Sequence, residues 1–140
     1  MNKPAHPVSA HEALIYAMVT MAAADRTMTD EELLKIGDIV KRLPIFAGYD
    51  SERLVKATEA CGAYLDHEDG IDENLDLIAT VLPPRLYETA YALAIEVASA
   101  DLHVEQEELR FLQMLRDRLN LDKLATAAIE RSARVRYRTM

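Results

Sequence analysis

The chain contains one short pattern twice, 76 residues apart. Residues 22–33 read Ala-Ala-Ala-Asp-Arg-Thr-Met-Thr-Asp-Glu-Glu-Leu, and residues 98–109 read Ala-Ser-Ala-Asp-Leu-His-Val-Glu-Gln-Glu-Glu-Leu. Six of the twelve positions are identical, and Met28 and Val104 form a conservative seventh pair. A repeat of this kind predicts two copies of one supersecondary unit, each burying a face against the other. It constrains the fold more than any other feature of the sequence.

The hydrophobic pattern predicts helices throughout the chain. No segment alternates with a period of two over the length of a strand, whereas apolar residues recur at helical spacing. Seven helices are expected, at about residues 9–24, 29–43, 51–67, 71–82, 84–100, 109–119 and 122–137. Ser9 with Glu12, and Thr29 with Glu32, have the Ser/Thr-x-x-Glu spacing of a capping box. The helices at 9–24 and 84–100 are apolar nearly all round, which predicts a central position for both.

These patterns predict an all-α fold in which two related helix-turn-helix units pack as one helical bundle. The single domain spans residues 1–140, with a flexible N-terminus over residues 1–8 and a basic C-terminal tail over residues 131–140. Hydrophobic residues make up 50% of the chain but aromatic residues only 6%, so the core must consist mainly of aliphatic side chains. The helical spacing of apolar residues also predicts that Leu33, Leu43 and Leu109 lie on the inward faces of their helices.

The composition also excludes several classes of protein. The single cysteine, Cys61, can form neither an internal disulfide nor a thiolate zinc site, and we expect it to be a small core residue. The longest apolar run, residues 13–24, is shorter than the roughly 20 residues of a membrane-spanning helix. The N-terminus does not have the pattern of a signal peptide. These features fit a cytoplasmic protein without a membrane span.

The charges are unevenly distributed along the chain. Its net charge is −8, but residues 1–130 carry 12 basic and 24 acidic side chains, which makes nucleic acid a poor partner. Arg131, Arg134 and Arg138 fall on one face of the last predicted helix, with Arg136 beside them. This face could dock on an acidic partner or associate peripherally with lipid headgroups, or it could be an ordinary solvated face.

Each copy of the repeat contains an acidic turn between two helices, for which two interpretations stand. In the structural one, the aspartate accepts backbone hydrogen bonds and the glutamates complement the dipole of the next helix. In the other, Asp25, Glu31, Asp101 and Glu107 hold a divalent cation, either one per turn or jointly if the turns converge. Oxygen ligands suit Ca²⁺, Mg²⁺ or Mn²⁺, while His103 could bias the second turn towards a transition metal. Neither turn is an EF-hand, because neither has its central glycine.

Catalytic signatures are absent from the sequence. There is no glycine-rich phosphate loop and no Gly-x-Ser-x-Gly elbow, and Ile15 replaces the second histidine that a zinc-protease helix would need after His11. A third acidic stretch, residues 66–73, is interpreted as a solvated loop, with Gly70 just after a helix end. We therefore expect a protein that is not an enzyme.

The doubled pattern Ala-x-Ala-Asp-x-x-Met/Val-x-x-Glu-Glu-Leu resembles the TerB family of tellurite-resistance proteins, over about residues 9–130. The resemblance implies a cytoplasmic, all-α domain that acts with other proteins of tellurite-resistance and stress-response systems. It also implies metal binding at the acidic turns, which carries over to Asp25, Glu31, Glu32, Asp101, Glu107 and Glu108. This chain departs from the family where Arg26 and Leu102 replace a common glycine, and Arg26 places a positive charge beside the first turn.

From residues and resemblance together, we expect a non-enzymatic, TerB-like stress-response domain that binds a divalent cation through its acidic inter-helix turns. Ca²⁺, Mg²⁺ or Mn²⁺ are the expected ions and Zn²⁺ is less favoured. The alternative is a metal-free protein-interaction or signalling adaptor.

Overall fold

The computed structural model describes residues 8–24, 28–98 and 106–140, and for Gln106 and Glu107 it describes the backbone only. This part of the chain forms seven α-helices, three short 3-10 turns and no strand, which confirms the all-α prediction. The helices are α1 (Ala10–Ala22), α2 (Asp30–Arg42), α3 (Leu54–Leu65), α4 (Gly70–Val81), α5 (Tyr87–Ala98), α6 (Gln106–Arg118) and α7 (Lys123–Arg136). The 3-10 turns are Pro44–Phe46, Ser51–Arg53 and Pro84–Leu86.

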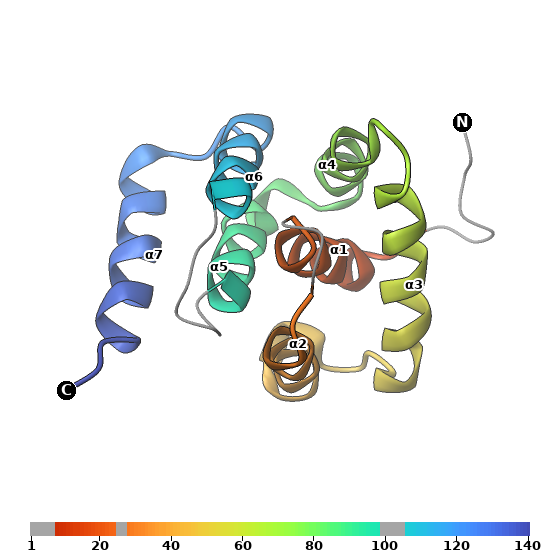
Figure 1. The fold of residues 1–140 in the computed structure, drawn as a ribbon, viewed down its shortest axis with the longest axis horizontal. Coiled ribbons are helices and arrows are strands. Elements are labelled where there is room, and N and C mark those ends of the chain that lie inside the picture. Colours follow the sequence, from red (N-terminus) through yellow and green to blue (C-terminus); the bar gives the residue numbers. More distant parts are fainter. Residues whose placement is uncertain (1–7, 25–27, 99–105) are drawn as a thin grey trace.

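Two helices, α1 and α5, form the centre of the molecule (Figure 1). Every residue of α1 from Glu12 to Ala22 is buried, because α1 packs against α3, α4 and α5. Helix α5 buries seven of its residues, from Ala90 onwards, between α1, α6 and α7. Since a helix that is apolar nearly all round must be covered on every side, the predicted central position of both helices is confirmed.

The structural repeat extends beyond the twelve-residue sequence pattern and includes whole helices. Helix α6 begins and ends 76 residues after α2, and α1 and α5 end at the equivalent alanines, Ala22 and Ala98. Helix α2 also contacts α5, while α6 contacts α1. Figure 1 shows α3 on the outer side of α1 and α7 on the outer side of α5. The related units are therefore α1–α3 and α5–α7, and α4 is an additional helix between them.

Helix α4 is held by both units. It packs against α1, α3 and α6, and Arg118 of α6 makes ion pairs with Asp72 and Asp76 of α4. Its first residue is Gly70, which corrects the prediction that this glycine follows a helix end. A Cβ atom at Gly70 would lie 2.0 Å from the carbonyl oxygen of Tyr64 in α3. The close approach of α3 and α4 therefore requires glycine at this position.

Both predicted capping boxes are present. Ser9 Oγ accepts a hydrogen bond from the backbone N–H of Glu12 at 3.1 Å, and Glu12 Oε1 accepts one from the backbone N–H of Ser9 at 3.1 Å. Thr29 and Glu32 make the same reciprocal pair at the start of α2. These bonds satisfy N–H groups that a helix terminus otherwise leaves without a partner.

Three leucines do not lie where the hydrophobic spacing predicts. Leu33 and Leu109 are 47% and 56% exposed, and Leu43 is 36% exposed. Leu33 and Leu109 both occupy the fourth position of their helices, α2 and α6, and each directly follows a buried glutamate, Glu32 or Glu108. In α6, Phe111 and Leu112 are buried instead. The predicted inward position is therefore wrong for both repeated leucines.

Candidate functional site

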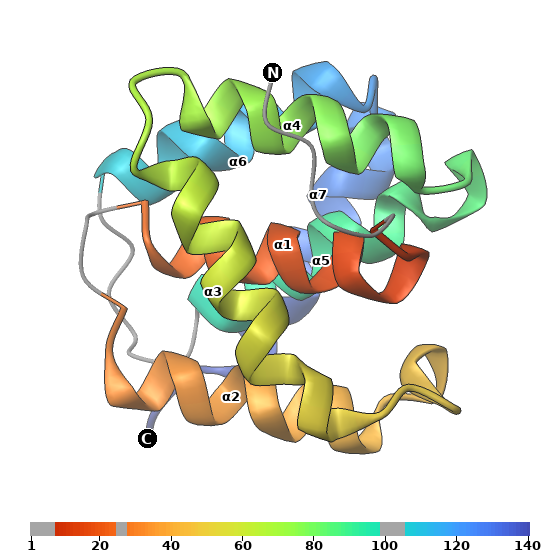
Figure 2. The same cartoon turned by 90° about the vertical axis from the view of Figure 1, so that its right-hand side faces the viewer.

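The two acidic turns start and end on the same side of the molecule. Helices α1 and α5 run in the same direction, and Figure 2 shows both ending on its left-hand side, where α2 and α6 begin. The chain therefore leaves α1 and α5, and enters α2 and α6, at one end of the bundle. We call this region, which includes residues 22–24, 28–32, 98 and 106–108, the acidic end.

Within the Glu-Glu pair of α2, the two glutamates have different environments. Glu32 is 2% exposed, and its Oε1 accepts hydrogen bonds from Thr29 N at 2.8 Å and from Thr29 Oγ1 at 3.0 Å. Glu108, the equivalent residue of α6, is 1% exposed. Glu31, in contrast, is exposed at the second position of α2. Glu32 is thus occupied by helix capping, and Glu31 is the member of its pair that faces solvent.

The remaining members of the predicted cation site, Asp25, Asp101 and the side chain of Glu107, lie outside the described residues. Arg26, Leu102 and His103 lie outside them too. Among the side chains that the structure does describe, no three His, Cys, Asp or Glu residues are grouped so that they could hold a metal ion.

A second candidate site is a cavity of about 350 Å³ between α5, α6 and α7. Ligand pockets in proteins begin at about this size. Each of the three helices contributes both apolar and polar side chains to its lining. The lining residues are Tyr91, Ile95, Ala98, Leu109, Leu112, Arg116, Glu130, Ala133, Arg134 and Tyr137.

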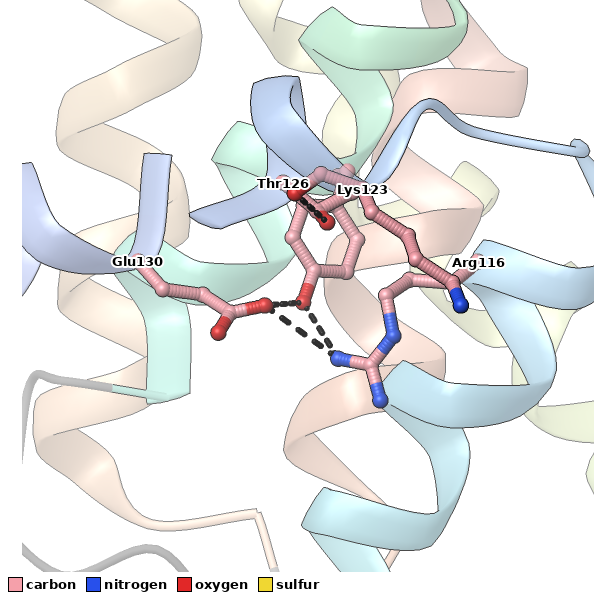
Figure 3. A network of polar contacts seen from close by, with 5 residues as sticks. Arg116, Lys123, Thr126 and Glu130 are labelled. Carbon is pink, nitrogen blue, oxygen red and sulfur yellow. Dashed lines mark hydrogen bonds and ion pairs between the residues drawn. The ribbon is translucent and has the colours of Figure 1, made fainter. Parts of the chain in front are cut away.

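A polar network joins the three helices at this cavity. Tyr91 donates a hydrogen bond to Glu130 Oε2 at 2.5 Å, and Arg116 Nη1 donates to Tyr91 Oη at 2.7 Å and to Glu130 Oε2 at 3.2 Å. Figure 3 shows Arg116 of α6 and Glu130 of α7 pointing towards each other. The same view shows the hydrogen bond that Thr126 donates to the Lys123 carbonyl in the first turn of α7.

The phenol of Tyr91 is fully buried, and this burial raises its pKa to about 12. The hydrogen bond to Glu130 contributes to this rise in pKa, whereas Arg116 opposes it. Tyr91 therefore stays protonated near neutral pH and acts as a donor to the Glu130 carboxylate. The network has one positive and one negative charge and is internally neutral.

Sequence analysis missed this network because its members are far apart in the chain and form no motif. One signal was present in the repeat. Tyr91 and Arg116 stand where the first unit has Ile15 and Val40, both buried apolar residues. When a polar residue replaces an apolar core residue in one copy of a repeat, that copy is expected to form a polar contact where the other copy has only apolar packing.

A neighbouring cluster connects α2, α5 and the end of α7. Glu96 of α5 pairs with Arg136, accepts a hydrogen bond from Tyr137 Oη at 2.9 Å, and lies 3.8 Å from Lys35 Nζ. Burial by itself raises the pKa of Glu96, but the hydrogen bonds from Arg136 and Tyr137 and the charge of Lys35 outweigh it and lower the pKa.

The arginines near the C-terminus do not form the single face that the sequence predicts. Arg138 lies beyond Arg136, the last residue of α7, and Arg136 is held by Glu96. Arg131 and Arg134 are exposed, but only Arg134 lines the cavity. In the part of the chain that is described, no helix has the length and apolar character needed to cross a membrane.

Comparison with known proteins identifies no relative of this chain: no family model, no curated protein and no solved structure matches it. The likeness to the TerB family therefore rests on the repeated pattern alone.

Proposed function

We propose that this chain is a non-enzymatic, TerB-like stress-response domain of the cytoplasm that binds a divalent cation at the acidic end. The observation that supports this most is the common direction of α1 and α5, which brings both inter-helix junctions to one side of the molecule (Figure 2). The proposed ligands are Asp25, Glu31, Asp101 and Glu107, and the proposed ion is Ca²⁺, Mg²⁺ or Mn²⁺.

Electrostatics gives a reason why a cation would stabilise this end. Two carboxylates about 4 Å apart repel each other by about 4 kcal/mol at an effective dielectric constant of 20. Carboxylates from two turns at one end of a bundle would be relieved of this repulsion by a shared cation. Because Glu32 is hydrogen-bonded to Thr29, the first-turn carboxylates of α2 that remain for such an ion are Asp30 and Glu31, of which Glu31 belongs to the repeated pattern.

The test is a thermal melt of chelator-treated protein with and without each cation. An ion at 100 times its dissociation constant adds about 2.7 kcal/mol of stability, which raises the Tm by several degrees. We expect this rise for the wild type and not for the Asp25→Asn, Asp101→Asn variant. Asp66→Asn, Glu68→Gln is the matched control, since it removes two exposed charges from the loop between α3 and α4. Equal melts of the wild type with and without every cation would contradict the proposal.

Exposed leucines favour one alternative function, that of a metal-free interaction module. Leu34 is 74% exposed, and it lies beside Leu33 in the first turns of α2, at the same end of the molecule as Leu109. A partner protein of the same stress-response system would cover these side chains and remove apolar surface from water. Loss of a partner from the Leu33→Ser, Leu34→Ser variant, together with unchanged melts in all cations, would support this alternative.

A further inference from the structure

The two units are connected differently, and the cavity lies between the helices of the second unit, α5, α6 and α7. In the first unit, residues 43–53 join α2 to α3, and this connection packs back against the helices. Phe46 is 3% exposed with its ring 5.6 Å from the His11 ring of α1, and His11 Nε2 lies 2.7 Å from the Ile45 carbonyl oxygen. In the second unit only residues 119–122 join α6 to α7. This shorter connection contains no aromatic residue.

The lining of the cavity combines apolar and charged side chains. Ile95, Leu109, Leu112 and Ala133 supply apolar surface, and Leu109 is more than half exposed. The charged groups are Arg116, Arg134 and Glu130, so the lining has one excess positive charge in a chain whose net charge is −8. A lining of opposite sign to the whole molecule indicates selection for a negatively charged group.

The hydrogen bonds already made leave cationic donors open to a ligand. The Glu130 carboxylate is held by Tyr91 and Arg116. Within the described chain, the bonds of Arg116 all go through Nη1, so its other N–H groups are available. Arg134 makes no ion pair with any described residue. The groups that remain for recognition are therefore two guanidinium groups, which suit planar carboxylates.

We propose that this cavity binds a small organic monocarboxylate with a short apolar body. The carboxylate lies between Arg134 and the free N–H groups of Arg116, and the apolar body lies against Ile95, Leu109 and Leu112. The buried Tyr91 orients Arg116 by accepting its hydrogen bond, and thereby keeps the guanidinium at the edge of the cavity. This site shares Ala98 with the acidic end, but its lining includes none of the proposed cation ligands, so it does not depend on the proposed cation.

The test is isothermal titration calorimetry of the full-length chain with octanoate. A chelator is present, so that the result does not depend on whether the acidic end binds a cation. We expect saturable binding of one octanoate per chain. Octanol, which has the same body without the charge, and inorganic phosphate, which has the charge without the body, should each bind at least about tenfold more weakly.

Comparison of Arg134→Gln with Arg131→Gln distinguishes binding in the cavity from a general effect of losing one positive charge. Both residues are exposed on α7 and both substitutions remove one positive charge, but only Arg134 lines the cavity. We expect Arg134→Gln to weaken octanoate binding by roughly tenfold or more, and Arg131→Gln to change it by less than about twofold. The proposal is overturned if octanoate does not saturate, if octanol or phosphate binds as tightly as octanoate, or if both variants weaken binding equally.

Discussion

At the scale of single residues, Cys61 shows how burial sets chemistry. Its sulfur is fully buried, 3.5 Å from Thr20 Oγ1 and 3.4 Å from Asn74 Nδ2, and it donates to the Tyr16 carbonyl at 3.8 Å. Burial raises the thiol pKa to about 12, although the contacts with Thr20 and Asn74 lower it in part. The prediction that Cys61 is a core residue is confirmed. Because the thiolate is the reactive form, this thiol is chemically silent in the native state.

This environment predicts slow modification of Cys61. At pH 8 the native protein should react with a disulfide reagent such as dithiobis(nitrobenzoate) at least about 100-fold more slowly than the protein in denaturant. The reason is that the native Cys61 thiol is neither exposed nor ionised. Release of the coloured thiol, followed over time, measures the rate. The Cys61→Ala variant has no thiol and gives the background signal of the reagent. Equal rates in the native and unfolded protein would contradict the buried placement.

At the scale of the helix, the repeated pattern is largely a signal for how a helix begins. In α2 the order is Met28, the Thr29 cap, Glu32 at the third position and Leu33 at the fourth. Apolar residues just before the cap and at the fourth position, around a capping box, mark a helix N-terminus. The repeat places Glu108 and Leu109 at the same positions of α6. This function explains why Leu33 and Leu109 are kept in both copies without being buried in the core.

The capping function of Glu32 can be measured against its neighbour. Glu32→Ala removes the acceptor of the Thr29 N–H and empties a buried position, so the free energy of unfolding should fall by about 1–3 kcal/mol. Glu31→Ala, at an exposed position, should change it by less than about 0.5 kcal/mol in chelator. Urea unfolding followed by circular dichroism measures both variants. A larger loss for Glu31→Ala would reverse the assigned roles of the two glutamates.

At the scale of the whole molecule, local patterns determined the helices but not their arrangement. The 3.6-residue spacing and the caps located the seven helices of the described chain, because each of these signals acts within a few residues. The network of Tyr91, Arg116 and Glu130 was not predicted, because these residues meet only when α7 packs on α5. The cavity was missed for the same reason, since its lining residues come from three helices that meet only in the folded chain.

Besides the ion pair of Arg116 with Glu130, Glu96 is a point at which α7 is joined to the rest of the bundle by charge. It contacts Arg136 and Tyr137 at the end of α7 and Lys35 of α2, so three helices meet at one carboxylate. Lys35 also lies over the Tyr137 ring, 5.6 Å from its centroid. The docking of α7, and with it one wall of the cavity, therefore depends on the ionisation of Glu96.

This dependence gives the domain a specific response to acid. The pKa of Glu96 is lowered in the folded state, so its contribution to stability is complete above the ordinary glutamate value of 4.5 and is lost as the pH falls through the lowered value. At pH 7, Glu96→Gln should be less stable than the wild type by about 1–3 kcal/mol. The difference should shrink towards zero as the pH falls below 4.5 and through the lowered pKa of Glu96. The exposed Glu88→Gln in the same helix is the control and should track the wild type throughout. Urea unfolding at a series of pH values measures all three proteins, and a difference that stays constant with pH would show that Glu96 stabilises α7 by packing rather than by charge.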